Sequence, residues 1–173
     1  MGILDLTERL QRLVGQRLWK ANRSLNLQVF HFGDRLEVTD RKGRSRETSS
    51  QALHLQGAWR ILKDGKVLVG ARDRMTPRGN PAVVPDGFTW NEPRSTLCDE
   101  KLELLFEERA SHPLCVTQVT CGAWGAFCVE LTDGYALEVF PDNSTGEQWR
   151  HIDRRAADTS QHFVFPEDAI ALA

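Results

Sequence analysis

The chain has 173 residues, of which 40% are hydrophobic and 27% charged, and its formal net charge is −2. This composition is typical of a soluble globular protein with one substantial core. No apolar run approaches the roughly 20 residues that a membrane-spanning helix needs, and the first residues lack the features of a signal peptide. We therefore expect a cytoplasmic protein that does not enter a membrane.

The charges are unevenly divided along the sequence. Residues 1–80 hold sixteen Lys and Arg against eight Asp and Glu, whereas residues 81–173 hold six against sixteen. The first part therefore carries a net charge of +8 and the second a net charge of −10. This division predicts either a charged partner or two parts of one chain that attract each other.

The first predicted element is an amphipathic helix over residues 3–20, whose apolar residues recur at helical spacing. Such a helix could cover a sheet or pair with the same helix of a second copy. The pattern then alternates, which indicates strands at 25–29 and 35–39, with Gly33-Asp34 as the hairpin turn between them.

A basic polar loop is expected at 41–50. It is followed by a strand at 52–62, which Asp64-Gly65 connects to another strand at 66–71. Residues 74–96 contain four prolines and predict a long loop, whose aromatic residues either anchor it or contact a ligand.

A second helix is expected over residues 97–109, with Ser95 or Thr96 as its N-cap. Pro113 prevents the helix from continuing. The remainder of the chain alternates again, and strands are expected at 114–121, 126–132, 135–140, 148–153 and 163–165.

This order predicts an α+β fold in a single domain over residues 1–173: a mainly antiparallel sheet or partial barrel with two covering helices. Residues on consistent faces of the strands should form the core. They are Leu55, Trp59, Ile61, Trp124, Val129, Leu131, Leu137 and Val139.

A short internal repeat is also present in the sequence. Gly57-Ala-Trp followed by Asp64-Gly65 has a counterpart in Gly122-Ala-Trp followed by Asp133-Gly134. This similarity predicts a two-fold pseudo-repeat with halves 1–73 and 97–165, joined by the loop 74–96. The alternative is chance recurrence of a tripeptide.

The sequence contains none of the common motifs for nucleophilic catalysis, zinc-dependent hydrolysis or phosphate binding by a glycine-rich loop. Its four cysteines, Cys98, Cys115, Cys121 and Cys128, form no closely spaced pairs. We therefore expect reduced thiols, no metal site and no cofactor, and the missing catalytic motif favours a protein that is not an enzyme.

Polar and aromatic residues of the predicted strands and the long loop form the candidate binding site. They are His54, Gln56, Arg60, Trp90, Trp149, Arg150, His151 and Asp153. His151 and Asp153 would share one strand face and could act as an acid–base pair or as metal ligands. The rows on the two strands could line one concave surface, or they could simply be solvent-exposed strand residues.

The basic segment 41–46 is the best candidate for contact with nucleic acid, because its side chains could neutralise phosphates. It lacks interleaved aromatic residues, and the acidic second part of the chain would repel a nucleic-acid backbone. We therefore expect a solvated loop and no nucleic-acid partner.

Three segments of the sequence resemble a family of small bacterial proteins that carry Trp-Arg motifs in their strands. The segments are Leu-His-Leu-Gln-Gly-Ala-Trp-Arg-Ile at 53–61, Leu-Glu-Val-Phe-Pro at 137–141 and Glu-Gln-Trp-Arg at 147–150. The resemblance implies no activity and no site residue.

Two functions remain open from the sequence. The first is a cytoplasmic protein-interaction or binding module whose partner is another protein or a second copy of the chain, as in a homodimer. The alternative is a small enzyme or small-molecule-binding protein that uses a concave sheet face. Its polar groups would be His54, Arg60, Arg150, His151 and Asp153, with residues 74–96 as a lid.

Overall fold

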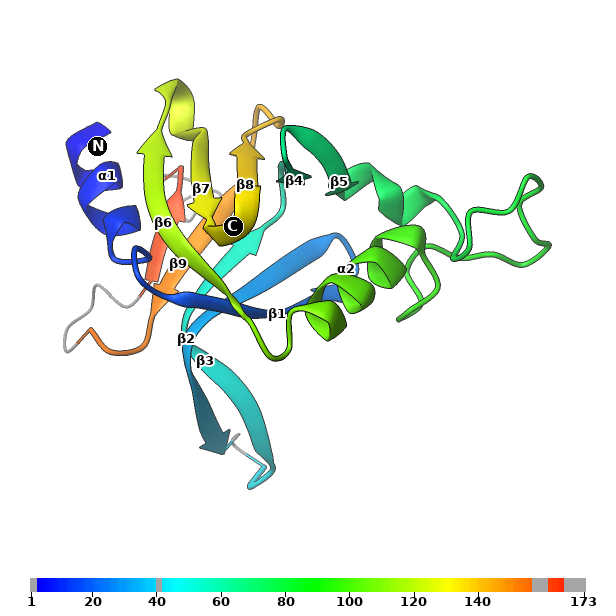
Figure 1. Cartoon of the computed structure of the whole chain (residues 1–173), viewed down its shortest axis with the longest axis horizontal. Coiled ribbons are helices and arrows are strands. Elements are labelled where there is room, and N and C mark those ends of the chain that lie inside the picture. The colour runs from blue at the N-terminus through cyan, green and yellow to red at the C-terminus, as the bar shows by residue number, and fades with distance from the viewer. Residues whose placement is uncertain (1–2, 40–41, 157–161, 167–173) are drawn as a thin grey trace.

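In the computed structural model, ten strands form one open antiparallel sheet with two α-helices packed beside it (Figure 1). The structure describes residues 3–39, 42–156 and 162–166. The helices are α1 (Ile3–Gln11) and α2 (Leu97–Glu108), and the strands are β1 (Arg17–Ser24), β2 (Leu27–Thr39), β3 (Ser45–Leu55), β4 (Ala58–Lys63), β5 (Lys66–Gly70), β6 (Leu114–Cys121), β7 (Phe127–Leu131), β8 (Tyr135–Phe140), β9 (Trp149–Asp153) and β10 (His162–Phe165). The predicted α+β fold with a mainly antiparallel sheet is confirmed. Among the described helices, none has the length and apolar character to cross a membrane.

Both parts of the chain follow one order of elements, an α-helix and then five strands. Along the sheet the order is β10-β9-β3-β2-β1-β6-β7-β8-β4-β5. If each strand is replaced by the strand five places away in sequence, β1 by β6, β2 by β7 and so on, the same strand order is obtained in reverse. At the centre β1 pairs with β6, with Leu18 opposite Leu114. The pseudo-repeat remains a prediction, and this strand order supports it.

The last two strands of each part lie beside the strands of the other part: β4 pairs with β8 and carries β5 at its outer edge, and β9 pairs with β3 and carries β10. A tryptophan lies at the start of each of these two pairing strands, Trp59 in β4 and Trp149 in β9. Trp59 packs edge-on against Phe30 with ring centroids 5.1 Å apart, and Trp149 packs edge-on against Phe127 at 5.0 Å. Trp149 is therefore the structural counterpart of Trp59, and the core combines residues from both parts.

Seven of the eight predicted core residues are buried, and the prediction is wrong for Trp124, which is 88% exposed. Trp124 does not lie on a strand face. It belongs to the short 3₁₀ segment η2 (Ala123–Gly125) between β6 and β7, where its φ of 59° is left-handed. The sequence similarity to Gly57-Ala-Trp therefore does not correspond to equivalent structure.

The predicted helix over residues 3–20 is also wrong in its length. α1 ends at Gln11, and β1 begins at Arg17 after a turn through Gly15, whose φ is +80°. Leu18 continues the helical spacing of apolar residues but points from β1 into the core. The apolar side of α1 is occupied within the chain, because Leu6 and Leu10 are buried and the helix lies against β6.

The predicted hairpin turn at Gly33-Asp34 is a bulge inside the continuous strand β2. Gly33 has a φ of +77°, and a Cβ there would lie 2.2 Å from the Ser50 hydroxyl oxygen, so a side chain would clash. β3 also takes in half of the predicted loop 41–50, whose Arg41 lies outside the described residues. The predicted strand 52–62 is divided at residues 56–57, where both backbone N–H groups donate to the Gln148 carbonyl.

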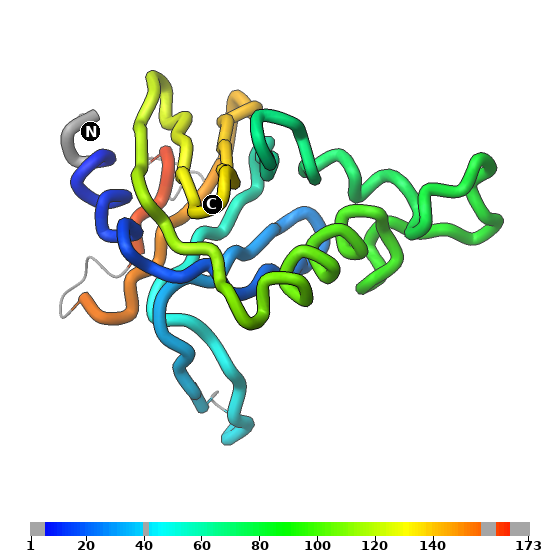
Figure 2. The backbone as a smooth tube through the Cα atoms, in the orientation of Figure 1, coloured from blue at the N-terminus to red at the C-terminus, as the bar shows by residue number. Residues whose placement is uncertain are grey.

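Two segments project away from the sheet in different directions (Figure 2): the tip of the β2–β3 hairpin and residues 77–95. Residues 77–95 follow the 3₁₀ segment η1 (Ala71–Met75), and their base is closed by a bridge between Pro77 and Thr96. Thr96 caps α2 by accepting a hydrogen bond from the Asp99 backbone N–H, as one of the two predicted N-caps.

The charge division is compensated in part by ion pairs inside one chain. Among the described residues, six ion pairs join residues 1–80 to residues 81–173. In four of them an arginine of the first part pairs with a carboxylate of the second, as in Arg12–Asp153 and Arg60–Glu138. The two parts attract each other, and the charge division by itself requires no partner.

Candidate functional site

The candidate residues of β3 and β9 lie on opposite faces of the sheet. His54 and Arg150 lie opposite each other on the outer face, which is the face of these strands that points away from the main core. Trp149, His151 and Asp153 alternate with Arg150 and lie on the inner face, where all three are buried. The two predicted rows therefore do not meet in one concave surface.

Trp149 forms part of the hydrophobic core. Its ring stacks on Phe165 with centroids 5.3 Å apart and on Phe163 at 5.6 Å. Its indole N–H donates a hydrogen bond to the Gly125 carbonyl at 2.9 Å, which satisfies its one buried donor. These contacts join β10 and the β6–β7 turn to the core.

His151 and Asp153 lie between the sheet and the chain that follows α1. His151 is fully buried, and its Nε2 donates to the Gln51 side-chain oxygen at 3.0 Å. Its Nδ1 is buried and has no partner among the described residues. Burial and the charge of Arg9 lower the pKa of His151 to about 3. The buried carboxylate of Asp153 pairs with Arg12 at 3.5 Å and is therefore engaged in a contact within the chain.

We expect His151 to make the protein sensitive to acid. The unfolded chain takes up a proton at this residue below its ordinary pKa of 6.5, whereas the folded chain stays neutral down to about 3. The stabilising effect of neutral His151 is thus present above pH 6.5 and is lost as the pH falls. Between pH 7 and pH 5 the expected loss is about 2 kcal/mol in the free energy of unfolding.

Urea unfolding of the wild type and His151→Gln at both pH values measures this effect. The variant should lose about 2 kcal/mol less than the wild type between the two pH values. His112→Gln, at an exposed histidine, is the control and should behave as the wild type. Equal pH dependence in all three proteins would contradict the assignment.

The other three candidates lie apart from these rows. The Arg60 side chain pairs with Glu138 on β8 and lies over the Phe140 ring at 5.3 Å. Gln56 belongs to the break between β3 and β4. Trp90 belongs to the projecting segment, where its carbonyl accepts a hydrogen bond from Arg23 at 2.8 Å.

The outer face of β2, β3, β9 and β10 has a regular pattern that the strand registers determine. One row of neighbours is Val29, His54, Arg150 and Val164, and the next is His31, Ala52, Ile152 and His162. Along each of these four strands, an apolar side chain therefore alternates with a basic or imidazole side chain. We call His31, His54, Arg150, Arg154 and His162 the histidine–arginine face. Only His54 and Arg150 of this group were predicted from the sequence.

Sequence reasoning missed His31, because its partners lie on β1 and β3, and the sequence does not show that these strands flank β2. Its Nε2 donates to the Asn22 side-chain oxygen at 2.5 Å, and its Nδ1 accepts from the Ser49 hydroxyl at 2.9 Å. Ser49 is fully buried, so its hydroxyl cannot meet a substrate. Burial, with smaller effects from Lys20 and Arg154, lowers the pKa of His31 to about 4.

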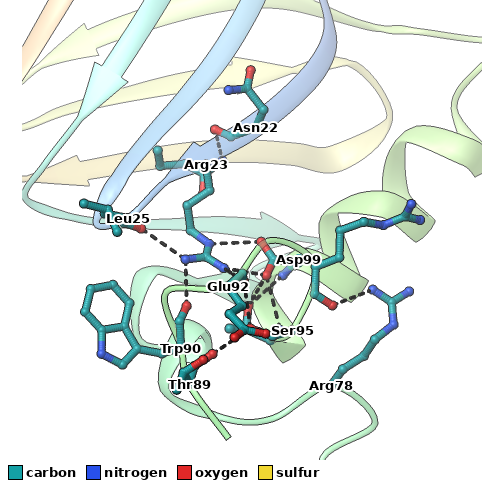
Figure 3. A network of polar contacts seen from close by, with 12 residues as sticks. Asn22, Arg23, Leu25, Arg78, Thr89, Trp90, Glu92, Ser95 and Asp99 are labelled. Carbon is teal, nitrogen blue, oxygen red and sulfur yellow. Dashed lines mark hydrogen bonds and ion pairs between the residues drawn. The ribbon is translucent and has the colours of Figure 1, made fainter.

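A hollow of about 670 Å³ lies between β1 and α2, and none of the eight predicted residues lines it. Arg23 crosses it and uses every N–H of its guanidinium (Figure 3). It donates twice to the Asp99 carboxylate, at 3.0 and 2.7 Å, and once each to the carbonyls of Leu25, Trp90 and Glu92. Arg23 therefore fastens the projecting segment to the sheet and to α2.

A second hollow, of about 520 Å³, adjoins the exposed Trp124. We call it the Trp124 groove. It is lined by Ala123, Trp124, Ala126, Phe140, Pro141, Asn143, Ser144, Thr145, Gly146, Gln148, Phe165 and Pro166. Most of these side chains are apolar, and none of these described lining residues is charged. Phe140 is 39% exposed, so a second aromatic ring is open to a partner.

The turn that carries Trp124 is held firmly. The Gly125 carbonyl accepts the hydrogen bond from buried Trp149, and a Cβ on Gly125 would lie 2.2 Å from the Phe165 ring. The Gly122 N–H also donates to the Ala126 carbonyl at 2.8 Å. Trp124 itself keeps a left-handed backbone that is uncommon for a bulky residue. The exposure of its ring is thus a fixed property of the fold.

No group of three or more His, Cys, Asp or Glu suited to a metal ion occurs in the part of the chain that the structure describes. The four cysteines are free thiols, and burial raises the pKa of Cys98 to about 12. A scan against protein-family models and searches of curated proteins and of solved structures found no match. The resemblance to small bacterial proteins therefore stays an expectation, and the site is argued from its geometry.

Proposed function

We propose that this protein is an interaction module that associates with a second copy of itself through the Trp124 groove. The observation that carries the proposal is Trp124, an 88% exposed tryptophan on a firmly held turn beside an apolar hollow. Tryptophan is enriched among the residues that dominate binding at protein interfaces. Exposed apolar surface beside a hollow is a common mark of an interaction site.

The second copy offers a matching segment, Pro81–Pro85. Its sequence is Pro-Ala-Val-Val-Pro, which carries no charge. Val83 is 80% exposed and Val84 58%. Burying each of these side chains at an interface would contribute about 1.5–3 kcal/mol before the costs of association.

The groove and the segment suit each other chemically. Prolines restrict the segment to extended conformations before binding, and grooves lined by aromatic side chains commonly bind such segments. The segment projects far from the β6–β7 turn of its own molecule (Figure 1). It is therefore available to the groove of another copy, and a reciprocal exchange would give a two-fold dimer.

A cytoplasmic location belongs to the same proposal. Its support is the set of four free cysteines, because thiols remain reduced in the cytoplasm.

The test is the measured mass as a function of concentration. We expect the wild type to exceed the monomer mass of 19.6 kDa as the concentration rises. A two-fold dimer contains two grooves, so Trp124→Ala removes two central interface residues at about 2 kcal/mol each and should weaken association about a thousandfold. Sedimentation equilibrium of both proteins measures the dissociation constants.

The matched control is Val67→Ala, because Val67 on β5 is also exposed but lies outside the groove and the segment. It should associate as the wild type does. The proposal is wrong if the wild type remains a monomer at all concentrations, or if Trp124→Ala associates as tightly as the wild type.

A further inference from the structure

Arg154 is a partly buried arginine without a carboxylate partner among the described residues. It follows β9, and its backbone N–H donates to the Ser50 carbonyl at 2.8 Å. One guanidinium nitrogen donates to the Ser49 carbonyl, also at 2.8 Å. Burial, together with nearby Arg46, lowers the pKa of Arg154, so its surroundings disfavour its positive charge.

Among the described residues, Arg154 donates hydrogen bonds to neutral backbone carbonyls, and the charged group that acts on it is Arg46. Ser49, whose carbonyl it contacts, hydrogen-bonds through its hydroxyl to His31. On the same face, Arg150 lies opposite His54 and has one guanidinium nitrogen 3.4 Å from His162 Nδ1. The positive charge of Arg154 contributes to the lowered pKa values of His31, His54 and His162.

The Glu147 carboxylate, which acts electrostatically on His54 and His162, is already engaged. Glu147 accepts two hydrogen bonds from Arg150, at 2.6 and 3.3 Å. It therefore neutralises Arg150, and among the described residues no carboxylate pairs with Arg154. Removing an unpaired charge from water is unfavourable unless a group of opposite charge joins it.

We propose that the histidine–arginine face binds a phosphate group, with Arg154 as the principal ligand and His54 as a second donor. A guanidinium presents its N–H groups in a fork that fits two phosphate oxygens. One of its nitrogens is held by Ser49, which fixes the orientation of the fork. His54 is half-buried on the same face, and burial lowers its pKa to about 4, so its ring remains a neutral N–H donor near pH 7.

This phosphate site differs from the Trp124 groove, since the two share no residue. The phosphate could come from the free ion or from a phosphate monoester. The shared chemistry is a phosphoryl group, whose oxygens can accept hydrogen bonds from the Arg154 guanidinium and the His54 ring N–H. Two compounds distinguish the sources: inorganic phosphate and phenyl phosphate.

The experiment is calorimetric titration of the full chain with each compound near pH 7 and at constant ionic strength. We expect the wild type to bind, and Arg154→Gln to lose at least tenfold in affinity. His54→Gln should weaken binding less. Arg72→Gln, at an exposed arginine on η1, is the matched control and should bind as the wild type does.

Binding of both compounds supports a monoester site, and binding of inorganic phosphate alone supports a site for the free ion. Thermal unfolding of each variant verifies that it is folded, and Arg154→Lys, which retains the charge, should bind with intermediate affinity. The proposal fails if the wild type binds neither compound, or if folded Arg154→Gln and His54→Gln both bind as the wild type does.

Discussion

Trp149→Ala should destabilise the protein by about 3–5 kcal/mol in the free energy of unfolding, the usual range for removing a fully buried tryptophan. The substitution removes a ring that packs against Phe127, Phe163 and Phe165. It also leaves the Gly125 carbonyl without its donor. Chemical denaturation followed by circular dichroism measures the difference.

Trp124→Ala is the matched control, because it removes the same side chain from a position that is 88% exposed. At protein concentrations where the wild type is a monomer, its free energy of unfolding should stay within about 0.5 kcal/mol of the wild-type value. Similar losses in the two variants would mean that Trp149 is not a central core residue. The comparison also verifies that any loss of association in Trp124→Ala comes from the interface.

Arg23→Ala should also have a large effect, about 3–5 kcal/mol, because it leaves Asp99 as an uncompensated carboxylate. The side chains of Arg23 and Asp99 are only 6% and 13% exposed. Burial alone would raise the pKa of Asp99, and the hydrogen bonds from Arg23 and Thr96 outweigh it, so the pKa is lowered. Urea unfolding near pH 7 measures the loss.

Two comparisons make this prediction specific. Arg60→Ala removes an arginine whose ion pair with Glu138 is much more exposed, and it should cost about 1 kcal/mol or less. The double variant Arg23→Ala/Asp99→Ala should recover part of the loss, because it leaves no unpaired charge. Equal effects of Arg23→Ala and Arg60→Ala would contradict the fastening role of Arg23.

Much of the fold could be predicted because the spacing of apolar residues along the sequence indicates whether a segment forms a strand or a helix. The ranges 114–121 and 135–140 match β6 and β8, and the helix expected from residue 97 begins there. The errors arose where two patterns overlapped. Leu18 fits both a helical and an alternating pattern, and Gly33-Asp34 suits a bulge as well as a turn. Only the strand pairings decide between these readings: Leu18 of β1 pairs with Phe32 and Leu114, and β2 continues past Gly33-Asp34 in its pairing with β3.

The candidate site was harder to predict, because it depends on which strands become neighbours. Alternation along β9 correctly separated Arg150 from His151 and Asp153. It could not indicate that His54 and Arg150 would join His31 from β2 and Arg154 on the outer face. The exposure of Trp124 was likewise hidden, because an aromatic residue beside apolar strands ordinarily indicates core. Its left-handed backbone could not be read from the sequence.

The most direct measurement of the central claim is a crosslink between two copies. A photoreactive amino acid replaces Val83, and the protein is mixed with wild type labelled uniformly with ¹⁵N before irradiation and mass spectrometry. The account predicts crosslinks from position 83 of the unlabelled copy to the labelled groove peptides around Trp124 and Phe140. Crosslinks confined to one copy, or directed to labelled peptides outside the groove, would contradict self-association through the Trp124 groove.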